Sequence, residues 1–255
     1  LYEIAVLREA QGSGGSLFMH DRVKIGDRLC ASAPKNDFPL VPTATEHLLV
    51  AGGIGITPVL SMVRTLKREG KRFMLHYCAR SPDMMAYRRE VSALAGDYAQ
   101  FHFDGGDPKR GLDLAALLAR PVAGRHVYVC GPKAMNETAI ALAAKAGWPA
   151  DRVHFEFFAA AAAAAGDQPI DVVLKRSGRT LAVAAGQTIL EALVAAGDDP
   201  LFDCRRGECG VCVTAVLEGE PLHRDYYLTD AEKAAGKSMC ICISRAKTPR
   251  LVLDL

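Results

Sequence analysis

The sequence predicts a multi-domain protein in which an α/β domain with a parallel sheet is followed by a smaller α+β domain. Between residues 44 and 158, short apolar runs alternate with segments of helical spacing, which is the pattern of βαβ units. Between residues 169 and 255, a cysteine cluster interrupts a series of short strand-like segments and one helix. A chain of 255 residues is long enough for two or three domains.

Residues 1–43 precede these two domains and are too few to bury a core of their own. We interpret them as the C-terminal part of a β domain whose N-terminal part is expected to precede Leu1. EIAVLR at 3–8 is an expected strand, and VKIGDRLCASAP at 23–34 an expected strand and hairpin. A short helix is expected over 16–20.

The α/β domain is expected to begin with a strand at 47–53 and a helix from Ile56 that Gly70 ends. The later elements follow the same alternation. Strands are expected at 71–79, 100–104, 126–132 and 153–158, with helices at 81–97, 112–120 and 133–147.

Two glycine turns follow strands of this domain. VAGGIGITP at 50–58 joins the first strand to the first helix, so that backbone amides and a helix N-terminus are available to an anionic pyrophosphate. It lacks the G-x-G-x-x-G fingerprint and would, taken alone, also suit a tight strand–helix turn. CGP at 130–132 ends another strand, and two such turns at the carboxyl ends of parallel strands form a ligand-binding crevice.

Residues 159–165 are seven alanines, and we interpret 159–168 as a linker. The segment 169–186 predicts two strands joined by a turn at Ser177 and Gly178. A helix is expected after Thr188, which forms a capping box with Glu191.

Three cysteines stand in the order Cys204-x4-Cys209-x2-Cys212, the spacing of the loop that holds a plant-type [2Fe–2S] cluster. Two irons need four thiolates, so a distant cysteine must complete the set. Gly207 and Gly210 lie within the loop, where glycine lets backbone N–H groups turn toward the sulfides without a Cβ collision.

The fourth thiolate has two candidates, Cys240 and Cys242, and we favour Cys242 because its spacing from the loop is the usual long one. Zinc is an alternative, but structural zinc sites usually contain paired CxxC motifs, and the first interval here is four residues. Disulfides are a further alternative, which the lack of a secretory pattern at the start of the sequence disfavours.

Composition narrows the classes of partner. The formal net charge of +2 is too near neutrality for a typical nucleic-acid binder. No run of eighteen apolar residues occurs, as a membrane-spanning helix would require. We therefore expect no nucleic-acid partner and no membrane. As separate expectations, we take the protein to be cytoplasmic and monomeric.

The motifs GGIGITP, CGP, HFEFF and CRRGECGVC, followed by SRAKTPRLVLDL, resemble the phthalate dioxygenase reductase family over essentially the whole chain. The resemblance implies a flavin-binding β-barrel fragment at 1–43, an NAD-binding domain at 44–158 and a plant-type ferredoxin domain of β-grasp fold at 169–255. It further implies that electrons pass from NADH through FMN and a [2Fe–2S] cluster to a Rieske-type oxygenase acting by hydroxylation or demethylation.

For FMN, the resemblance implies contacts from Arg8, in the strand IAVLR, and from Gly14, Gly15 and Ser16 near the phosphate. Leu7 replaces the family's usual lysine, which weakens one phosphate contact. The family's Arg-x-Tyr-Ser motif would lie before Leu1. Ser16 would alternatively act only as a helix cap.

For NADH, the resemblance places a catalytic group of residues at the flavin–nicotinamide contact: Thr57, Cys130, Glu156 and Phe158. A free cysteine is commonly a small buried hydrophobe, and Phe158 would also suit a core. The nucleotide is expected against Gly52, Gly53, Gly55, Thr57, Pro58, Arg80, Ser81, Cys130, Gly131, Pro132 and Phe158. Arg80 and Ser81 stand where relatives have an acid at position 81, which leaves room for the 2′-phosphate of NADPH.

Two other function classes stay open on the residues alone. One is a ferredoxin-type electron-transfer module with a non-catalytic nucleotide domain, and the other is a reductase for a different acceptor such as a cytochrome or free flavin. Arg205 and Arg206, beside the cysteines, would be either a solvated rim or a docking surface for the oxygenase.

Overall fold

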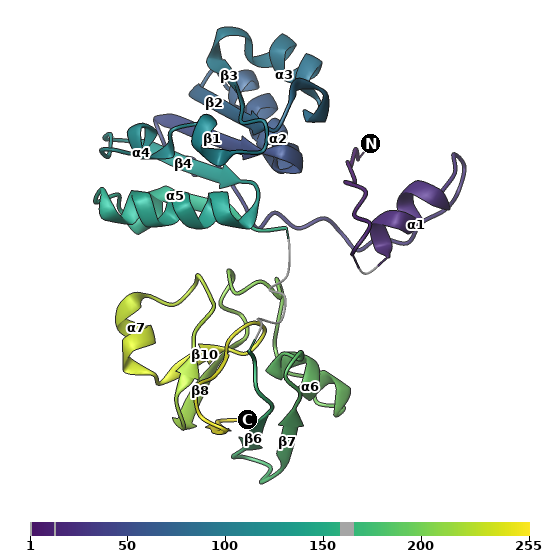
Figure 1. The fold of residues 1–255 in the computed structure, drawn as a ribbon, viewed down its shortest axis with the longest axis vertical. Helices are drawn as coiled ribbons and strands as arrows, with labels where there is room; N and C mark the ends of the chain where they lie inside the picture. Colours follow the sequence, from purple (N-terminus) through teal and green to yellow (C-terminus); the bar gives the residue numbers. More distant parts are fainter. Residues whose placement is uncertain (1, 13, 159–165) are drawn as a thin grey trace. The chain divides into compact units, whose positions relative to one another are not determined.

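The computed structural model describes residues 2–12, 14–158 and 166–255, and the chain folds as two compact units, Leu1–Phe158 and Ala159–Leu255 (Figure 1). Residues 159–165 of the expected linker lie outside the described residues. No helix in the described ranges is long and apolar enough to cross a membrane.

The first unit is built on a five-stranded sheet in which every neighbouring pair is parallel, as the βαβ pattern predicts. The strand order is β3-β2-β1-β4-β5. The strands are β1 (Glu46–Gly52), β2 (Arg72–Ala79), β3 (Ala99–Phe103), β4 (Arg125–Cys130) and β5 (Val153–Glu156).

Helices cover both faces of this sheet (Figure 1). Residues of β1 alternate between the two faces: Leu49 packs in a core with α2 (Ile56–Arg68) and α3 (Arg88–Ala95), and Leu48 packs in a second core with α5 (Lys133–Lys145). A single turn, α4 (Leu114–Leu117), lies beside α5. Short 3-10 turns complete the unit: η1 (Gly53–Gly55), η2 (Pro82–Met84), η3 (Gly96–Tyr98), η4 (Pro108–Arg110) and η5 (Ala150–Arg152).

Two helix predictions were too long. The segment 81–97 forms η2 and then α3, because Tyr87 adopts a left-handed conformation with φ of 55° and interrupts the helical hydrogen bonds. The segment 112–120 forms only the single turn α4, which Asp113 caps by accepting a hydrogen bond from the Ala116 N–H at 2.9 Å.

The N-terminal strands predicted at 3–8 and 23–34 are not formed, whereas the short helix is confirmed as α1 (Gly15–Asp21). A strand needs a neighbour to hydrogen-bond its backbone, and none of the described strands pairs with either segment. Residues 3–8 contact α1 instead: the Val6 carbonyl lies 2.7 Å from His20 Nε2, and Arg8 pairs with Asp21 at 3.0 Å.

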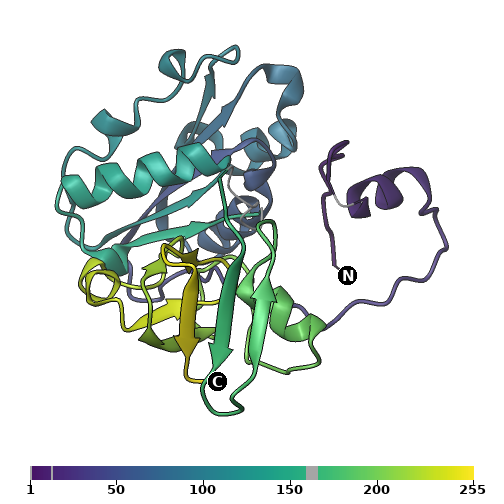
Figure 2. The same cartoon turned by 60° about the horizontal axis from the view of Figure 1, so that its bottom comes forward.

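The second unit has a mixed sheet in the order β10-β8-β12-β6-β7, and Figure 2 shows β6 running beside β7. This confirms the α+β module predicted from the sequence. Its strands are β6 (Ile170–Leu174), β7 (Thr180–Val183), β8 (Val213–Glu218), β10 (Ser238–Cys240) and β12 (Arg250–Leu253), with a separate pair of β9 (Pro221–Leu222) and β11 (Arg245–Ala246).

Two capped helices accompany this sheet. The predicted capping box of α6 (Ile189–Ala195) is confirmed: Thr188 Oγ1 accepts the Glu191 N–H at 3.1 Å, and the Glu191 carboxylate accepts the Thr188 N–H at 2.8 Å. The sequence analysis missed α7 (Asp230–Ala235), which follows a second capping box formed by Thr229 and Glu232.

Two arginines, the partly buried Arg224 and the buried Arg245, fix the start of the second unit to its body. Arg224 makes two hydrogen bonds to the Asp167 carboxylate, one of them at 3.0 Å. Arg245, which is only 3% exposed, donates to the carbonyl of Gln168 at 2.7 Å and also to that of Gln187. Residues 167 and 168 are therefore part of this unit's packing.

Candidate functional site

The first candidate site lies where the strand order of the parallel sheet reverses. The chain proceeds from β1 outward to β2 and β3, and then returns to β4 on the other side of β1. In open α/β sheets, ligands bind at the carboxyl ends of the strands at such a switch point. Gly52 ends β1 and Cys130 ends β4 here, so both predicted glycine turns lie at this point.

The two turns pack so closely that only glycine fits between them. A Cβ at Gly55 would lie 2.1 Å from the carbonyl oxygen of Cys130. A Cβ at Gly131 would lie 3.1 Å from the Cα of Gly52 and 2.1 Å from the Met135 side chain. The turns at 52–55 and 130–132 therefore form one backbone surface.

The N-terminus of α2 directly follows this surface in the sequence, since Gly55 precedes the helix. Gly55 is the N-cap, the first turn carries no acidic residue, and Thr57 Oγ1 donates to the Ile54 carbonyl at 3.1 Å. Unpaired N–H groups and the helix dipole make such a terminus favourable for an anion. The observed arrangement fits the pyrophosphate of a nicotinamide nucleotide.

A cavity of about 230 Å³ lies between Thr57 and the N-terminal segment. Glu3 in this segment pairs with Arg64 of α2 at 3.5 Å, and Tyr87 contributes a further wall that the sequence analysis did not single out. Tyr87 is the N-cap residue of α3 and adopts a left-handed backbone conformation with a positive φ. The lining residues are Glu3, Ile4, Ala5, Thr57, Leu60, Arg64 and Tyr87.

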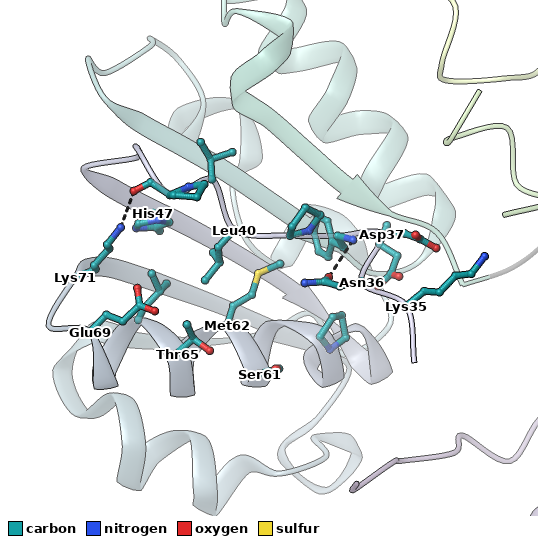
Figure 3. Close-up of a pocket in the computed structure, with 17 residues that line it drawn as sticks. Lys35, Asn36, Asp37, Leu40, His47, Ser61, Met62, Thr65, Glu69 and Lys71 are labelled. Atoms are coloured by element: carbon teal, nitrogen blue, oxygen red, sulfur yellow. Dashed lines mark hydrogen bonds between the residues drawn. The ribbon is translucent and has the colours of Figure 1, made fainter. Parts of the chain in front are cut away.

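The other residues predicted at the nicotinamide contact are not all gathered there. Glu156 lines a different cavity of about 640 Å³, between residues 35–42 and α2, whose charged and polar wall includes Lys71 and His47 (Figure 3). Cys130 is 1% exposed within the core, and Phe158 is 48% exposed. Of the four residues predicted at this contact, Thr57 alone lines the cavity next to residues 3–5.

The residues predicted to contact FMN are held by local hydrogen bonds. Gly14 precedes α1 with φ of 94°, and Gly15 begins the helix. Ser16 Oγ does not cap α1; it accepts the Glu9 N–H at 3.0 Å and donates to the Glu9 carbonyl at 3.3 Å. Arg8 pairs with Asp21 at half-exposed positions.

Arg80 and Ser81 follow β2 at the same edge of the sheet as the glycine turns. The Arg80 side chain is exposed, and its carbonyl accepts the Gly105 N–H at 3.0 Å. Nearby, Arg88 lies over the rings of Phe101 and Phe103, with 5.9 and 5.8 Å from its guanidinium carbon to the ring centres. Sequence reasoning missed Arg88, which no motif marks.

The second candidate site is the cysteine loop that joins α6 to β8. Gly207 and Gly210 adopt φ of 74° and 76°, as their placement among the cysteines suggests. A Cβ at Gly210 would lie 2.2 Å from the ring of Tyr227, and one at Gly207 would lie 2.7 Å from Ile243. The loop is therefore covered closely by two other segments of the same unit.

The thiols of this site fall into two groups. Cys204 hydrogen-bonds with Cys209, and Cys212 hydrogen-bonds with both Cys240 and Cys242. In the portions of the chain that the structure describes, no three Cys, His, Asp or Glu side chains converge as around a single metal ion. Thiols in two groups fit a two-iron cluster, in which each iron takes two thiolates.

Backbone N–H groups favour the ionised form of Cys204, and the thiolate is the form that binds metal. Burial raises the pKa of Cys204, but N–H groups of Arg206, Glu208 and Cys209 outweigh it and the pKa is lowered. The Arg206 N–H lies 3.3 Å from the sulfur of Cys204. Hydrogen bonds from Cys240 and Cys242 lower the pKa of Cys212 to about 3.

The two candidates for the fourth ligand differ in what they contact. Cys242 accepts a backbone N–H from Gly207 of the loop and interacts electrostatically with Cys204. Cys240 ends β10, and its electrostatic neighbours include Asp225. The contacts of Cys242 with both thiol groups support it as the fourth ligand.

Together, the parallel sheet with its glycine surface and the cysteine loop define an oxidoreductase that combines a nicotinamide-nucleotide domain with an iron–sulfur domain. Residues 49–140 match the oxidoreductase NAD-binding domain, and residues 172–247 match the 2Fe-2S iron-sulfur cluster binding domain.

Three known proteins are similar over nearly the whole chain. Vanillate O-demethylase oxidoreductase of Pseudomonas sp. (strain HR199 / DSM 7063) is 43% identical over 100% of this chain and 81% of its own length. The solved structure of phthalate dioxygenase reductase is 40% identical with a TM-score of 0.70, covering 98% of this chain and 78% of that one. An intact type IV self-sufficient cytochrome P450 monooxygenase is 40% identical with a TM-score of 0.70, over 99% of this chain but 33% of that one.

The chain belongs to the phthalate dioxygenase reductase family.

Proposed function

We propose that this chain transfers electrons from NADH, through FMN and a [2Fe–2S] cluster, to a Rieske-type oxygenase. The observation that carries the proposal is the presence, in one chain, of a nucleotide-type switch point and a loop that gathers cysteine thiols in two groups. Membership of a family of reductases supports it. We further propose that the protein is monomeric and cytoplasmic.

The proposed nucleotide site uses backbone rather than side chains. The glycine surface made by Gly52, Gly53, Gly55 and Gly131 lets the chain approach the coenzyme, and the N-terminus of α2 faces its phosphates. Pro58 lies in the first turn of α2, and Pro132 is the N-cap residue of α5. We propose that Arg80 and Ser81 lie at the adenosine end of the bound coenzyme, where they leave room for the 2′-phosphate of NADPH.

At the reacting end, Thr57 lies between the nucleotide surface and the cavity beside residues 3–5. We propose that it orients the nicotinamide toward the flavin, with Cys130, Glu156 and Phe158 nearby and Arg8, Gly14, Gly15 and Ser16 toward the flavin phosphate. When bound, FMN accepts two electrons as hydride and the cluster accepts them singly, so both groups are needed.

In the second unit, the proposed cluster ligands are Cys204, Cys209, Cys212 and Cys242. Backbone hydrogen bonds of the loop favour the thiolate form of Cys204, and such bonds also tune the potential of a bound cluster. Exposed apolar side chains stand in or near the loop: Leu201 is 80%, Val211 45% and Tyr227 51% exposed. We propose that this rim meets the oxygenase.

The test combines spectroscopy with turnover. Purified protein should contain two irons and two sulfides per chain, absorb visible light, and reduce an acceptor dye with NADH when FMN is supplied. A colourless protein with stoichiometric zinc would overturn the proposal. Cluster colour without NADH-driven dye reduction would instead support the ferredoxin-type module.

A cytochrome acceptor is the second candidate, because the P450 monooxygenase above contains a region similar to this whole chain. Coupled NADH consumption should be measured with a Rieske oxygenase and with a P450 haem domain as separate acceptors. Faster consumption with the haem domain would favour this second candidate.

A further inference from the structure

A buried carboxylate links two parts of the cysteine site. Asp225, whose side chain is 0% exposed, accepts the Leu228 N–H on Oδ2 at 2.9 Å and the Ser244 hydroxyl on Oδ1 at 3.1 Å. Ser244 follows Cys242 by two residues. The carboxylate therefore fixes the segment that carries the proposed fourth ligand to the segment around residue 225.

The same segment packs against the cysteine loop. The N–H of Tyr226 donates to the carbonyl of Gly207 at 2.9 Å, and a Cβ at Gly207 would lie 3.0 Å from the Cα of Asp225. Asp225 also interacts electrostatically with the thiol of Cys240. Its carboxylate is thus within electrostatic range of the thiol group formed by Cys212, Cys240 and Cys242.

Two cationic or ionisable groups face the Asp225 carboxylate. Nδ1 of His223 lies 3.5 Å from Oδ1, and Nζ of Lys233 lies 4.0 Å from Oδ2. Lys233 also donates to the Asp225 carbonyl at 2.7 Å and is 27% exposed. Because the ammonium is at the solvent edge and the carboxylate is buried, water screens the positive charge more than the negative one.

We propose that Asp225 is a positioning residue for the [2Fe–2S] cluster and that its charge lowers the reduction potential of the cluster. Reduction adds one electron to the cluster, and a nearby buried negative charge makes that addition less favourable. The inference rests on the cluster assignment proposed above. The proposal assigns the segment from His223 to Leu228 a role in electron transfer, although no sequence motif marks this segment.

The experiment is a potentiometric titration of the full chain, followed by visible absorbance and by electron paramagnetic resonance. Asp225→Asn keeps the shape and removes the charge, so the equilibrium constant for one-electron reduction should rise about tenfold, which is 59 mV. Lys233→Gln removes the partly compensating cation, so the potential should shift downward. Asp171→Asn, which changes an exposed carboxylate on β6, is the matched control and should leave the potential unchanged.

The opposite signs of the first two shifts distinguish charge from a merely structural role. Shifts of Asp225→Asn and Lys233→Gln in the same direction, or an Asp225→Asn potential equal to the wild-type one, would overturn the proposal. If Asp225→Asn does not retain iron, Lys233→Gln decides alone, and a potential that rises or stays constant would refute it. Failure of the cluster assignment itself is distinct, since the wild-type chain would then lack iron and sulfide and show no titration.

Discussion

Gly55→Ala perturbs the closest approach in the nucleotide site. The added Cβ would lie 2.1 Å from the carbonyl oxygen and 2.5 Å from the carbonyl carbon of Cys130, and both atoms belong to the end of buried β4. Ordinary contact begins at 3.4 Å, so the two turns must separate by about 1.3 Å. Overpacking of this kind costs about 1–3 kcal/mol in the free energy of unfolding.

The same separation should impair the reaction with NADH. A misplacement of about 1 Å in an active site can lower catalysis about 100-fold, so kcat/KM for NADH-driven dye reduction should fall 10- to 100-fold by the same principle. Cluster absorbance should not change, because the cysteine loop lies in the other unit.

The single tryptophan allows the loss of stability to be measured separately. Trp148 is buried in the first unit, so its fluorescence in urea follows unfolding of that unit. Gly70→Ala is the matched control: its Cβ meets open space, but φ of 63° costs about 1–2 kcal/mol. If Gly55→Ala matches wild type in both stability and kcat/KM, or if Gly70→Ala loses as much kcat/KM, the reasoning about the glycine surface is wrong.

Three further predictions address the cluster loop and the histidines. Cys242→Ser should lose most of the bound iron and Cys240→Ser should keep it, as measured by iron and sulfide content; the reverse result would exchange the ligands. Gly210→Ala, with φ of 76° and a Cβ 2.2 Å from the ring of Tyr227, should also lower iron content, and adding Tyr227→Ala should restore part of it; no recovery would mean that the ring is not the obstacle. Burial lowers the pKa of His76 from 6.5 to about 4, so the unfolded chain binds more protons between these values and the urea midpoint should fall as pH drops from 7 toward 4. His76→Gln should reduce that dependence, and an unchanged slope would contradict it.

The parallel sheet could be predicted from the sequence because its signals are local. A strand is predicted by the apolar run that ends at Gly52, and a helix by the apolar spacing from Ile56 to the glycine at position 70. Each of these patterns depends only on residues that are neighbours in the sequence. The spacing of the cysteines likewise reflects a loop whose conformation is set by its own glycines. Capping of α6 was predictable for the same reason.

The remaining features depend on contacts between distant residues. EIAVLR has strand-forming residues, but without a pairing partner its backbone contacts α1 instead. The break at Tyr87 arises in a segment whose residues favour helix, so propensity alone extended the helix too far. Asp225 is a single carboxylate in a polar stretch, and only the fold shows that it is buried against the cysteine loop.

The contacts of Arg224 and Arg245 bear on where the second unit can be cut free. Asp167 and Gln168 are bound to its body, so a fragment beginning at Pro169 would leave the Arg224 guanidinium without its carboxylate and Arg245 without one of its two carbonyls. Burying an unpaired charge is costly, about 3–5 kcal/mol when a partner is removed. An excised iron–sulfur protein for use as a stand-alone electron carrier should therefore start before Asp167.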